Sequence, residues 1–233
     1  MNNEEKSKVA IINYGMGNLF SIKNACANVG LNAIITSSED DILYSDAVIL
    51  PGVGAFGRAM DNLKNLGLID ILKEIINKGK PFLGICLGMQ LLMSKSYEFG
   101  EHQGFNILKG EVINFNDNLD HATKRCKVPH VGWNEIYPVD SGLCWENSLL
   151  NGLNPGDFFY FVHSYYVKPE DQGIVLTTTT YGDFEFCSSI QYKNICACQF
   201  HPERSGKKGM VIYKNLFNLI KRAEEGKFSV QAA

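Results

Sequence analysis

The sequence has no long apolar run and no excess of charge of one sign. None of its apolar stretches approaches the ~20 residues that a membrane-spanning helix needs. Residues 1–8 are polar and mixed in charge, without the apolar core of a signal peptide. The formal net charge is −3, and no basic run is long enough to follow a phosphate backbone. We therefore expect a cytoplasmic protein that binds neither membranes nor nucleic acid.

The sequence also lacks a disulfide framework, because its seven cysteines are odd in number and irregularly spaced. In a reducing compartment most of them would be small core residues. Cys196 and Cys198 have the spacing of a strand, but no second pair accompanies them, so we expect no metal site. We expect no cofactor either.

The order of apolar and helical patterns indicates an α/β fold. Strand-like runs alternate with helix-like runs up to the strand at 81–85, which is typical of a parallel sheet covered on both faces. From about residue 104, short β-rich runs, among them 111–115 and 157–167, predict an antiparallel extension of the same sheet, closed by a helix at about 208–224. We predict one domain over residues 1–233: a mixed sheet, mostly parallel in its core, with helices on both faces. Residues 1–7 and about 226–233 are expected to be flexible.

The most informative feature is a cysteine at the end of an apolar run, with a glycine two positions away on each side. Gly84-x-Cys86-x-Gly88 has the pattern of a nucleophile elbow, with sulfur in place of a serine oxygen. A helix-like run from Leu87 to Lys95 would point its N-terminal N–H groups at the sulfur and lower its pKa. A lone cysteine is more often a core residue, but these neighbours favour a nucleophile.

A histidine with a carboxylate nearby supplies the partners that such a nucleophile needs. Glu203 follows His201 at two-residue spacing, so it could hold the imidazole in one tautomer and stabilise its protonated form. His-Pro-Glu alone is a weak signal, but together with the elbow it predicts a cysteine-dependent acyl-transfer enzyme. The other histidines in the sequence are His102, His121, His130 and His163.

Acyl transfer also requires hydrogen-bond donors for the oxyanion. The N–H of Leu87, directly after the nucleophile, is one candidate, and the N–H of Val53, after the strand-like run 47–50, is the other. The same segment contains Gly52-x-Gly54-x-x-Gly57, which matches the dinucleotide-binding fingerprint. Nucleotide binding is the less favoured alternative, because no acidic residue ends a following strand about 20 residues on.

The elbow, the His201–Glu203 pair and the segment from Pro51 resemble the triad-type (class I) glutamine amidotransferases. Within that family, the chain is similar to the glutaminase subunits of imidazole glycerol phosphate synthase over about residues 9–219. The blocks that carry this narrower resemblance are Asn13–Asn18, Leu50–Gly57, Val128–Asn134 and Tyr160–Tyr165.

The resemblance implies a single glutamine amidotransferase domain in which Cys86, His201 and Glu203 hydrolyse glutamine to glutamate. Cys86 would attack the side-chain amide, and His201 would protonate the departing ammonia. The ammonia would pass to a (β/α)8-barrel synthase subunit, in a heterodimer that makes imidazole glycerol phosphate for histidine biosynthesis. The implied glutamine-binding residues are Gly52, Gln90, His163, Ser164 and Tyr165, and the implied partner-facing residues are Asn18, Tyr160 and Arg204.

Two departures from the family pattern leave the acceptor open. Arg204 stands where lysine is usual, and residues 104–108 replace a more usual Gly-Leu-Gly-Leu-like run. One alternative is the same chemistry feeding a different acceptor synthase, such as a sugar-precursor amidotransferase. Others are a stand-alone γ-glutamyl hydrolase and a non-catalytic interaction module, which the intact triad disfavours. For His130, Trp133 and the aromatic residues of 157–166, the pattern does not separate core packing from a site role.

Overall fold

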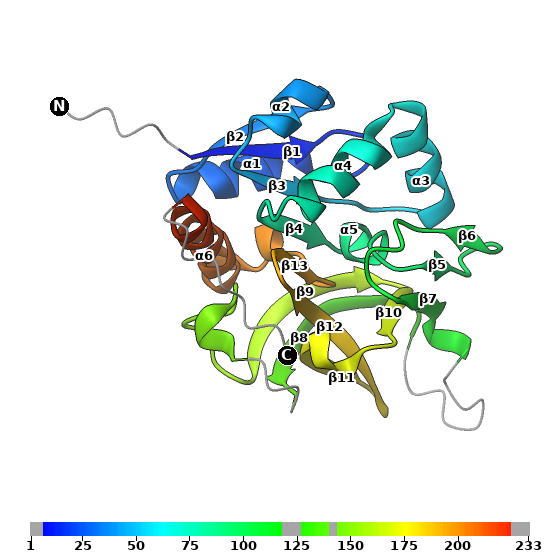
Figure 1. Ribbon diagram of the computed structural model, residues 1–233. Helices are drawn as coiled ribbons and strands as arrows, with labels where there is room; N and C mark the ends of the chain where they lie inside the picture. Colours follow the sequence, from blue (N-terminus) through cyan, green and yellow to red (C-terminus); the bar gives the residue numbers. More distant parts are fainter. Residues whose placement is uncertain (1–6, 118–126, 140–143, 225–233) are drawn as a thin grey trace.

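The computed structural model describes residues 7–117, 127–139 and 144–224. The expected flexible segments, apart from Ser7, lie outside the described residues, as do His121 and Cys126. Within the described ranges, a nine-stranded sheet dominates the fold (Figure 1). Its strands, in spatial order, are β2 (Asn32–Thr36), β1 (Lys8–Ile12), β3 (Ala47–Leu50), β4 (Phe82–Ile85), β13 (Ile195–Cys198), β12 (Phe184–Tyr192), β11 (Val175–Tyr181), β8 (His130–Pro138) and β9 (Asp157–His163).

Strand pairing confirms the predicted mixed sheet. Neighbours from β2 to β13 are parallel, and the pairs from β13 to β9 are antiparallel. The inner parallel strands β3, β4 and β13 are wholly buried, as expected when helices cover both faces.

A second sheet was not predicted from the sequence. It has four strands in the order β10 (Tyr165–Pro169), β7 (Gly110–Asn114), β5 (Lys95–Ser96) and β6 (His102–Gln103). The expectation that the runs at 111–115 and 157–167 extend the large sheet was therefore wrong in part. The chain leaves that sheet at Ser164, between β9 and β10, and apolar alternation does not reveal which strand a segment pairs with.

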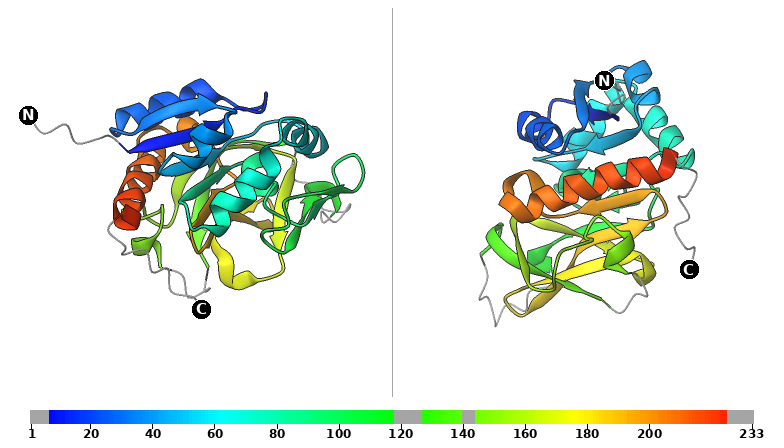
Figure 2. Two further views of the ribbon diagram at one scale, coloured as in Figure 1. Left: turned by 45° about the horizontal axis from the view of Figure 1, so that its top comes forward. Right: turned by 90° about the vertical axis from the view of Figure 1, so that its left-hand side faces the viewer.

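Helices cover both faces of the large sheet, as predicted (Figure 2). α1 (Leu19–Asn28) and α6 (Gly206–Glu224) share one apolar cluster with Val9 and Ile11 of β1. Ala10 and Ile12 of the same strand face the opposite cluster, because successive side chains of a strand alternate between faces. That cluster includes side chains of α2 (Glu39–Leu43), α3 (Phe56–Asn65) and α4 (Leu68–Asn77).

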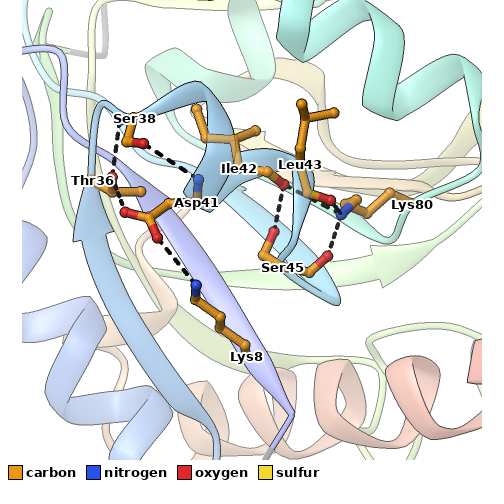
Figure 3. A network of polar contacts seen from close by, with 8 residues as sticks. All are labelled: Lys8, Thr36, Ser38, Asp41, Ile42, Leu43, Ser45 and Lys80. Carbon is orange, nitrogen blue, oxygen red and sulfur yellow. Dashed lines mark hydrogen bonds and ion pairs between the residues drawn. The ribbon is translucent and has the colours of Figure 1, made fainter.

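A polar network holds α2 at the edge where the parallel strands begin (Figure 3). The Lys80 ammonium donates to the carbonyls of Ile42 (3.3 Å) and Leu43 (2.8 Å), and also to that of Ser45. These bonds satisfy carbonyls that a helix leaves unpaired at its C-terminus. Asp41, near the start of α2, accepts from Lys8 (3.1 Å). The Lys80 bonds therefore lie where β3 and β4 begin, at the end of these strands opposite to Cys86.

The loops after three adjacent parallel strands meet at the other edge. β3, β4 and β13 lie side by side, with Leu50 opposite Gly84 and Ile85 opposite Cys198. Each strand therefore delivers the next part of the chain to the same place: Pro51 after β3, Cys86 after β4, and Gln199 to His201 after β13. Ligand sites of open α/β sheets form at this carboxyl edge.

Candidate active site

Cys86 occupies the sharp turn between β4 and α5 (Leu87–Gln90). Its φ of 53° lies in the left-handed region, which residues with a side chain adopt rarely and which is common in strained functional turns. The Cys86 N–H donates to the carbonyl of Cys198 at 2.7 Å, which ties the turn to β13. The residue is buried, with 5% of its surface exposed.

The two glycines of the elbow are required by close backbone approach. A Cβ on Gly88 would lie 1.8 Å from the carbonyl oxygen of Leu50, and one on Gly84 would lie 3.0 Å from the carbonyl oxygen of Gly88. Normal carbon–oxygen contacts are longer than either distance. The elbow is therefore packed directly against the end of β3, as the spacing of the glycines predicts.

The helix after the elbow is shorter than predicted. The expected run from Leu87 to Lys95 ends at Gln90, and Lys95 already begins β5. The carbonyl of Leu92 accepts from the N–H groups of Ile107 (3.1 Å) and Leu108 (3.0 Å). These long-range bonds take an acceptor that a continued helix would use, and helix propensity cannot anticipate them.

His201 and Glu203 lie side by side at the end of β13, with 2.8 Å between Nδ1 of the imidazole and Oε1 of the carboxylate. The Nε2 atom of His201 is buried and makes no hydrogen bond with any described residue, which leaves it available to exchange a proton with a substrate. Burial alone would lower the pKa of His201. The neighbouring charge of Cys86 and the Glu203 carboxylate outweigh it and raise that pKa to about 10. The raised pKa favours the imidazolium form of His201, which suits an ion pair with a thiolate at Cys86.

The two expected oxyanion donors lie at the ends of neighbouring strands. In the described part of the chain, neither the N–H of Leu87 nor that of Val53 meets an acceptor. Val53 is 43% exposed, and Gly54 after it has a φ of 110°, which an L side chain rarely adopts. Val53 therefore lies in a partly exposed turn, and the position after it has a backbone conformation that favours glycine.

The glycines that resemble a dinucleotide fingerprint are explained by packing inside the protein. A Cβ on Gly52 would lie 2.3 Å from the Tyr14 hydroxyl, and one on Gly57 would lie 2.5 Å from the His102 ring. The Tyr14 hydroxyl donates to the Pro51 carbonyl at 2.7 Å and so holds the start of the loop. Burial, followed by the charge of nearby Cys86, raises the pKa of Tyr14. These contacts give the glycines a role that needs no nucleotide.

Several polar atoms of the expected glutamine-binding residues already have hydrogen-bond partners within the protein. Gln90 is buried, and its amide nitrogen donates to the carbonyl of Tyr165 (3.0 Å). His163 contacts the same carbonyl through Nδ1 (2.9 Å) and His130 through Nε2 (3.1 Å), so neither ring nitrogen is left for a ligand. Ser164, at the break between the two sheets, is half-buried. The role of this segment in holding glutamine stays a prediction.

The three expected partner-facing residues belong to elements in mutual contact. The Arg204 guanidinium lies 4.3 Å from the centre of the Tyr160 ring. Trp133, 55% exposed, meets Tyr160 edge to face at 6.2 Å between ring centres. Asn18 caps the N-terminus of α1 through Ser21, and α1 packs against the short turn η4 (Pro202–Arg204).

Sequence reasoning assigned no role to Gln199, which contacts the nucleophile. Its amide nitrogen lies 3.4 Å from the Cys86 sulfur, and its side chain is fully buried. A signal was present, because Gln199 is the single polar residue between Ile195 and Phe200. A buried polar side chain in an apolar run must find a partner, and here the nearest partners belong to the elbow.

The described residues carry no group of three or more His, Cys, Asp or Glu side chains arranged to hold a metal ion. Among the described helices, none has the length and apolarity to cross a membrane. What the site does offer is a buried cysteine, an imidazole of raised pKa beside it, and two backbone N–H groups that meet no acceptor in the described residues. Such a set can form a thioester with a carboxamide carbon and hydrolyse it. It places the chain in the class of cysteine-dependent acyl-transfer enzymes.

Comparison with known proteins narrows this class. The family model described as "Glutamine amidotransferase class-I" matches residues 10–219. The chain is 49% identical to the imidazole glycerol phosphate synthase subunit HisH of Aquifex aeolicus, over 89% of this chain and 95% of that protein. It is 42% identical to the subunit of the same name from Geobacter sulfurreducens, over 90% and 97%. A crystal structure of a glutamine amidotransferase has the same fold, with a TM-score of 0.67 at 17% identity, covering 91% of this chain and 98% of that one.

The chain therefore belongs to the class I glutamine amidotransferase family, as its motifs predict.

Proposed function

We propose that this chain is the glutaminase subunit of an imidazole glycerol phosphate synthase. The observation that carries the proposal is the meeting of Cys86 with the buried His201–Glu203 pair at one sheet edge. The near-full-length identity to synthase subunits named HisH favours this acceptor over others. We also propose that residues 1–233 form one glutamine amidotransferase domain and that the protein works in the cytoplasm.

The proposed chemistry uses the charges that the site already holds. The Cys86 thiolate attacks the side-chain carbonyl carbon of glutamine, and the N–H groups of Val53 and Leu87 stabilise the oxyanion. His201 donates its Nε2 proton to the amide nitrogen, and ammonia leaves as the C–N bond breaks. His201 then accepts a proton from water, which attacks the γ-glutamyl thioester. Glutamate leaves, and the Cys86 thiolate is regenerated.

The proposed partner is a (β/α)8-barrel synthase subunit that receives the ammonia. The outer face of β8 and β9 supports a docking surface, because it exposes Val131, Trp133 and Phe158, each 50–55% accessible. Arg204, stacked on Tyr160 in the same region, is the type of residue that anchors interfaces. The turn η4 contains Glu203, a member of the proposed triad, and Arg204 directly after it. A partner that contacts Arg204 would therefore lie one residue away from Glu203 in the chain.

The test mixes the purified chain with candidate barrel subunits and follows glutamate release. We expect slow release alone, and release several-fold faster with an imidazole glycerol phosphate-forming barrel and its phosphoribosyl-formimino substrate. Stimulation by a sugar-precursor synthase alone would instead favour the alternative acceptor. Full turnover without any barrel would indicate a stand-alone hydrolase. No glutamate release with any barrel would overturn the proposal.

A further inference from the structure

The Cys86 sulfur lies at one end of a hydrogen-bonded series of buried amide groups. Nε2 of Gln199 lies 3.4 Å from Sγ of Cys86, and Oε1 of Gln199 lies 3.1 Å from Nε2 of Gln90. Nε2 of Gln90 is in turn 3.0 Å from the carbonyl oxygen of Tyr165. Both glutamines are at most 5% exposed, so the series is closed to solvent.

The carbonyl of Tyr165 fixes the direction of every bond in this series. A carbonyl only accepts, so the atom of Gln90 that faces it must be the NH₂ group. The second hydrogen of that NH₂ points to Gln199 and requires an acceptor, which makes the facing atom of Gln199 its oxygen. The other end of the Gln199 amide, facing Cys86, is then the NH₂ group. Gln199 is thus bound to present a donor, and not an acceptor, to the sulfur.

Two histidines reinforce this arrangement from the other side of the same carbonyl. His163 approaches the Tyr165 oxygen with Nδ1 at 2.9 Å, so Nδ1 carries the hydrogen and Nε2 accepts from Nδ1 of His130 at 3.1 Å. Burial, as the largest cause, lowers the pKa of His163 to about 3 and that of His130 to about 4, so both rings are neutral. The Tyr165 carbonyl therefore accepts from His163 as well as from Gln90, and the His163 contact fixes the carbonyl in place for Gln90.

We propose that Gln199 is a further catalytic residue, whose fixed amide N–H stabilises the thiolate of Cys86. A donor to a charged acceptor forms a stronger bond than a donor to a neutral one, so the contact favours the thiolate over the thiol. When the sulfur is acylated it loses its charge, and the bond weakens. When water cleaves the thioester the charge returns, and Gln199 stabilises the departing sulfur. The proposal rests on the proposed function only in taking Cys86 as the nucleophile.

The test measures how the reactivity of Cys86 depends on pH, since a structural role for Gln199 would not move that profile. Wild type, Gln199→Met and Gln199→Glu are alkylated with iodoacetamide from pH 5 to 10, and modification of Cys86 is quantified by peptide mass spectrometry. We expect the alkylation profile of Gln199→Met to be displaced by roughly one pH unit toward higher pH, which is a tenfold loss of rate on the acid side of the profile. Gln199→Glu should shift further, because it places a carboxylate beside the sulfur.

The matched control is Gln191→Met, which replaces another buried glutamine of the same sheet, bonded to Asn147 and not to the elbow. It should keep the wild-type profile. An unchanged profile in a folded Gln199→Met variant would overturn the proposal. If that variant does not fold, NMR of the wild-type protein tests the proposal instead. The side-chain amide ¹⁵N resonance of Gln199 should shift over the pH range in which Cys86 becomes reactive, and it should not shift in Cys86→Ala. A resonance that does not respond overturns the proposal, whereas absence of glutamine hydrolysis by wild type would instead refute the proposed function.

Discussion

His201 and Glu203 form a buried pair in which Nδ1 and Oε1 lie 2.8 Å apart and the side chains are 4% and 2% exposed. Pro202 between them begins the turn η4, which brings two side chains that are two residues apart to one point. The backbone of His201 is held as well, because its N–H donates to the Tyr160 carbonyl at 2.9 Å and its carbonyl accepts from the Ser205 hydroxyl at 2.7 Å. The carboxylate therefore faces an imidazole that has little freedom to turn away.

We predict that Glu203→Gln lowers the pKa of His201, because it removes a negative charge from the Nδ1 side of the ring. In wild type, NMR should show the His201 ring titrating near pH 10. In Glu203→Gln the midpoint should fall by about 1–3 units, and kcat for glutamine hydrolysis should fall by roughly 10²-fold or more. Glu185→Gln removes an exposed carboxylate from β12 and serves as the control. An unchanged His201 titration midpoint in Glu203→Gln would contradict this account of the pair.

Cys86→Ser should abolish glutamine hydrolysis, with a loss of about 10³-fold or more, because a serine hydroxyl is a far weaker nucleophile than a thiolate in this site. Folding and affinity for the proposed barrel partner should be nearly unchanged, since Cys86 is buried and is not among the residues proposed to contact the partner. Steady-state glutamate release, circular dichroism and titration with the barrel measure these effects. Cys144→Ser, at an exposed cysteine, is the control and should keep full activity. Normal turnover by Cys86→Ser would remove Cys86 from the mechanism.

The sequence was sufficient to predict the parts of the site that depend on local backbone. The elbow needs glycine on both sides of Cys86 and a strand before it, and the structure has both. The His201–Glu203 contact follows from two-residue spacing across a proline. The parallel core could also be predicted, because buried strands separated by amphipathic helices leave few other topologies.

The remaining features depend on contacts between segments far apart in sequence. The second sheet pairs β7 with β10, and the chain changes sheet at Ser164 without a turn signal. The short α5 results from bonds that the N–H groups of residues 105–108 make to the carbonyls of residues 91–93. Gln199 meets Cys86 across 113 residues of sequence, so its partner could not be found from periodicity. Contacts of this kind can be identified only from the three-dimensional structure.

The two elbow glycines should differ in their tolerance of a methyl group. We predict that Gly88→Ala destabilises the protein by about 3 kcal/mol or more, because its Cβ would lie 1.8 Å from the Leu50 carbonyl oxygen and backbone must move. Gly84→Ala should cost about 1 kcal/mol, because its closest contact is 3.0 Å and a small shift relieves it. Urea denaturation of both variants tests the order. Equal stabilities would show that the elbow does not pack against β3 as closely as the geometry indicates.

His130 and His163 should make the protein sensitive to acid. Both are buried, and burial lowers their pKa values to about 4 and about 3, whereas a histidine of the unfolded chain titrates near 6.5. Below pH 6.5 the unfolded state therefore binds more protons than the folded state, so the free energy of unfolding falls as the pH falls. The stabilising difference is complete above pH 6.5 and is lost progressively toward pH 4 and 3. For His130 alone, the loss of stability between pH 7 and pH 4 amounts to about 3 kcal/mol.

Chemical denaturation at pH 7, 5.5 and 4 measures this loss of stability. The double variant His130→Gln, His163→Gln should show a smaller slope of the unfolding free energy against pH, because glutamine does not titrate. Gln191→Met, which changes a buried polar residue but removes no histidine, provides the comparison and should leave the slope unchanged. NMR of the wild-type rings gives a second readout that does not depend on a folded variant. A proton on His163 would occupy the Nε2 atom that accepts from His130, and a proton on His130 would charge a buried ring. Both rings should therefore stay neutral until the pH falls below about 4–5. Rings that titrate near 6.5 in the folded protein would show that the pair is open to solvent, and would also remove the support that His163 gives to the Tyr165 carbonyl.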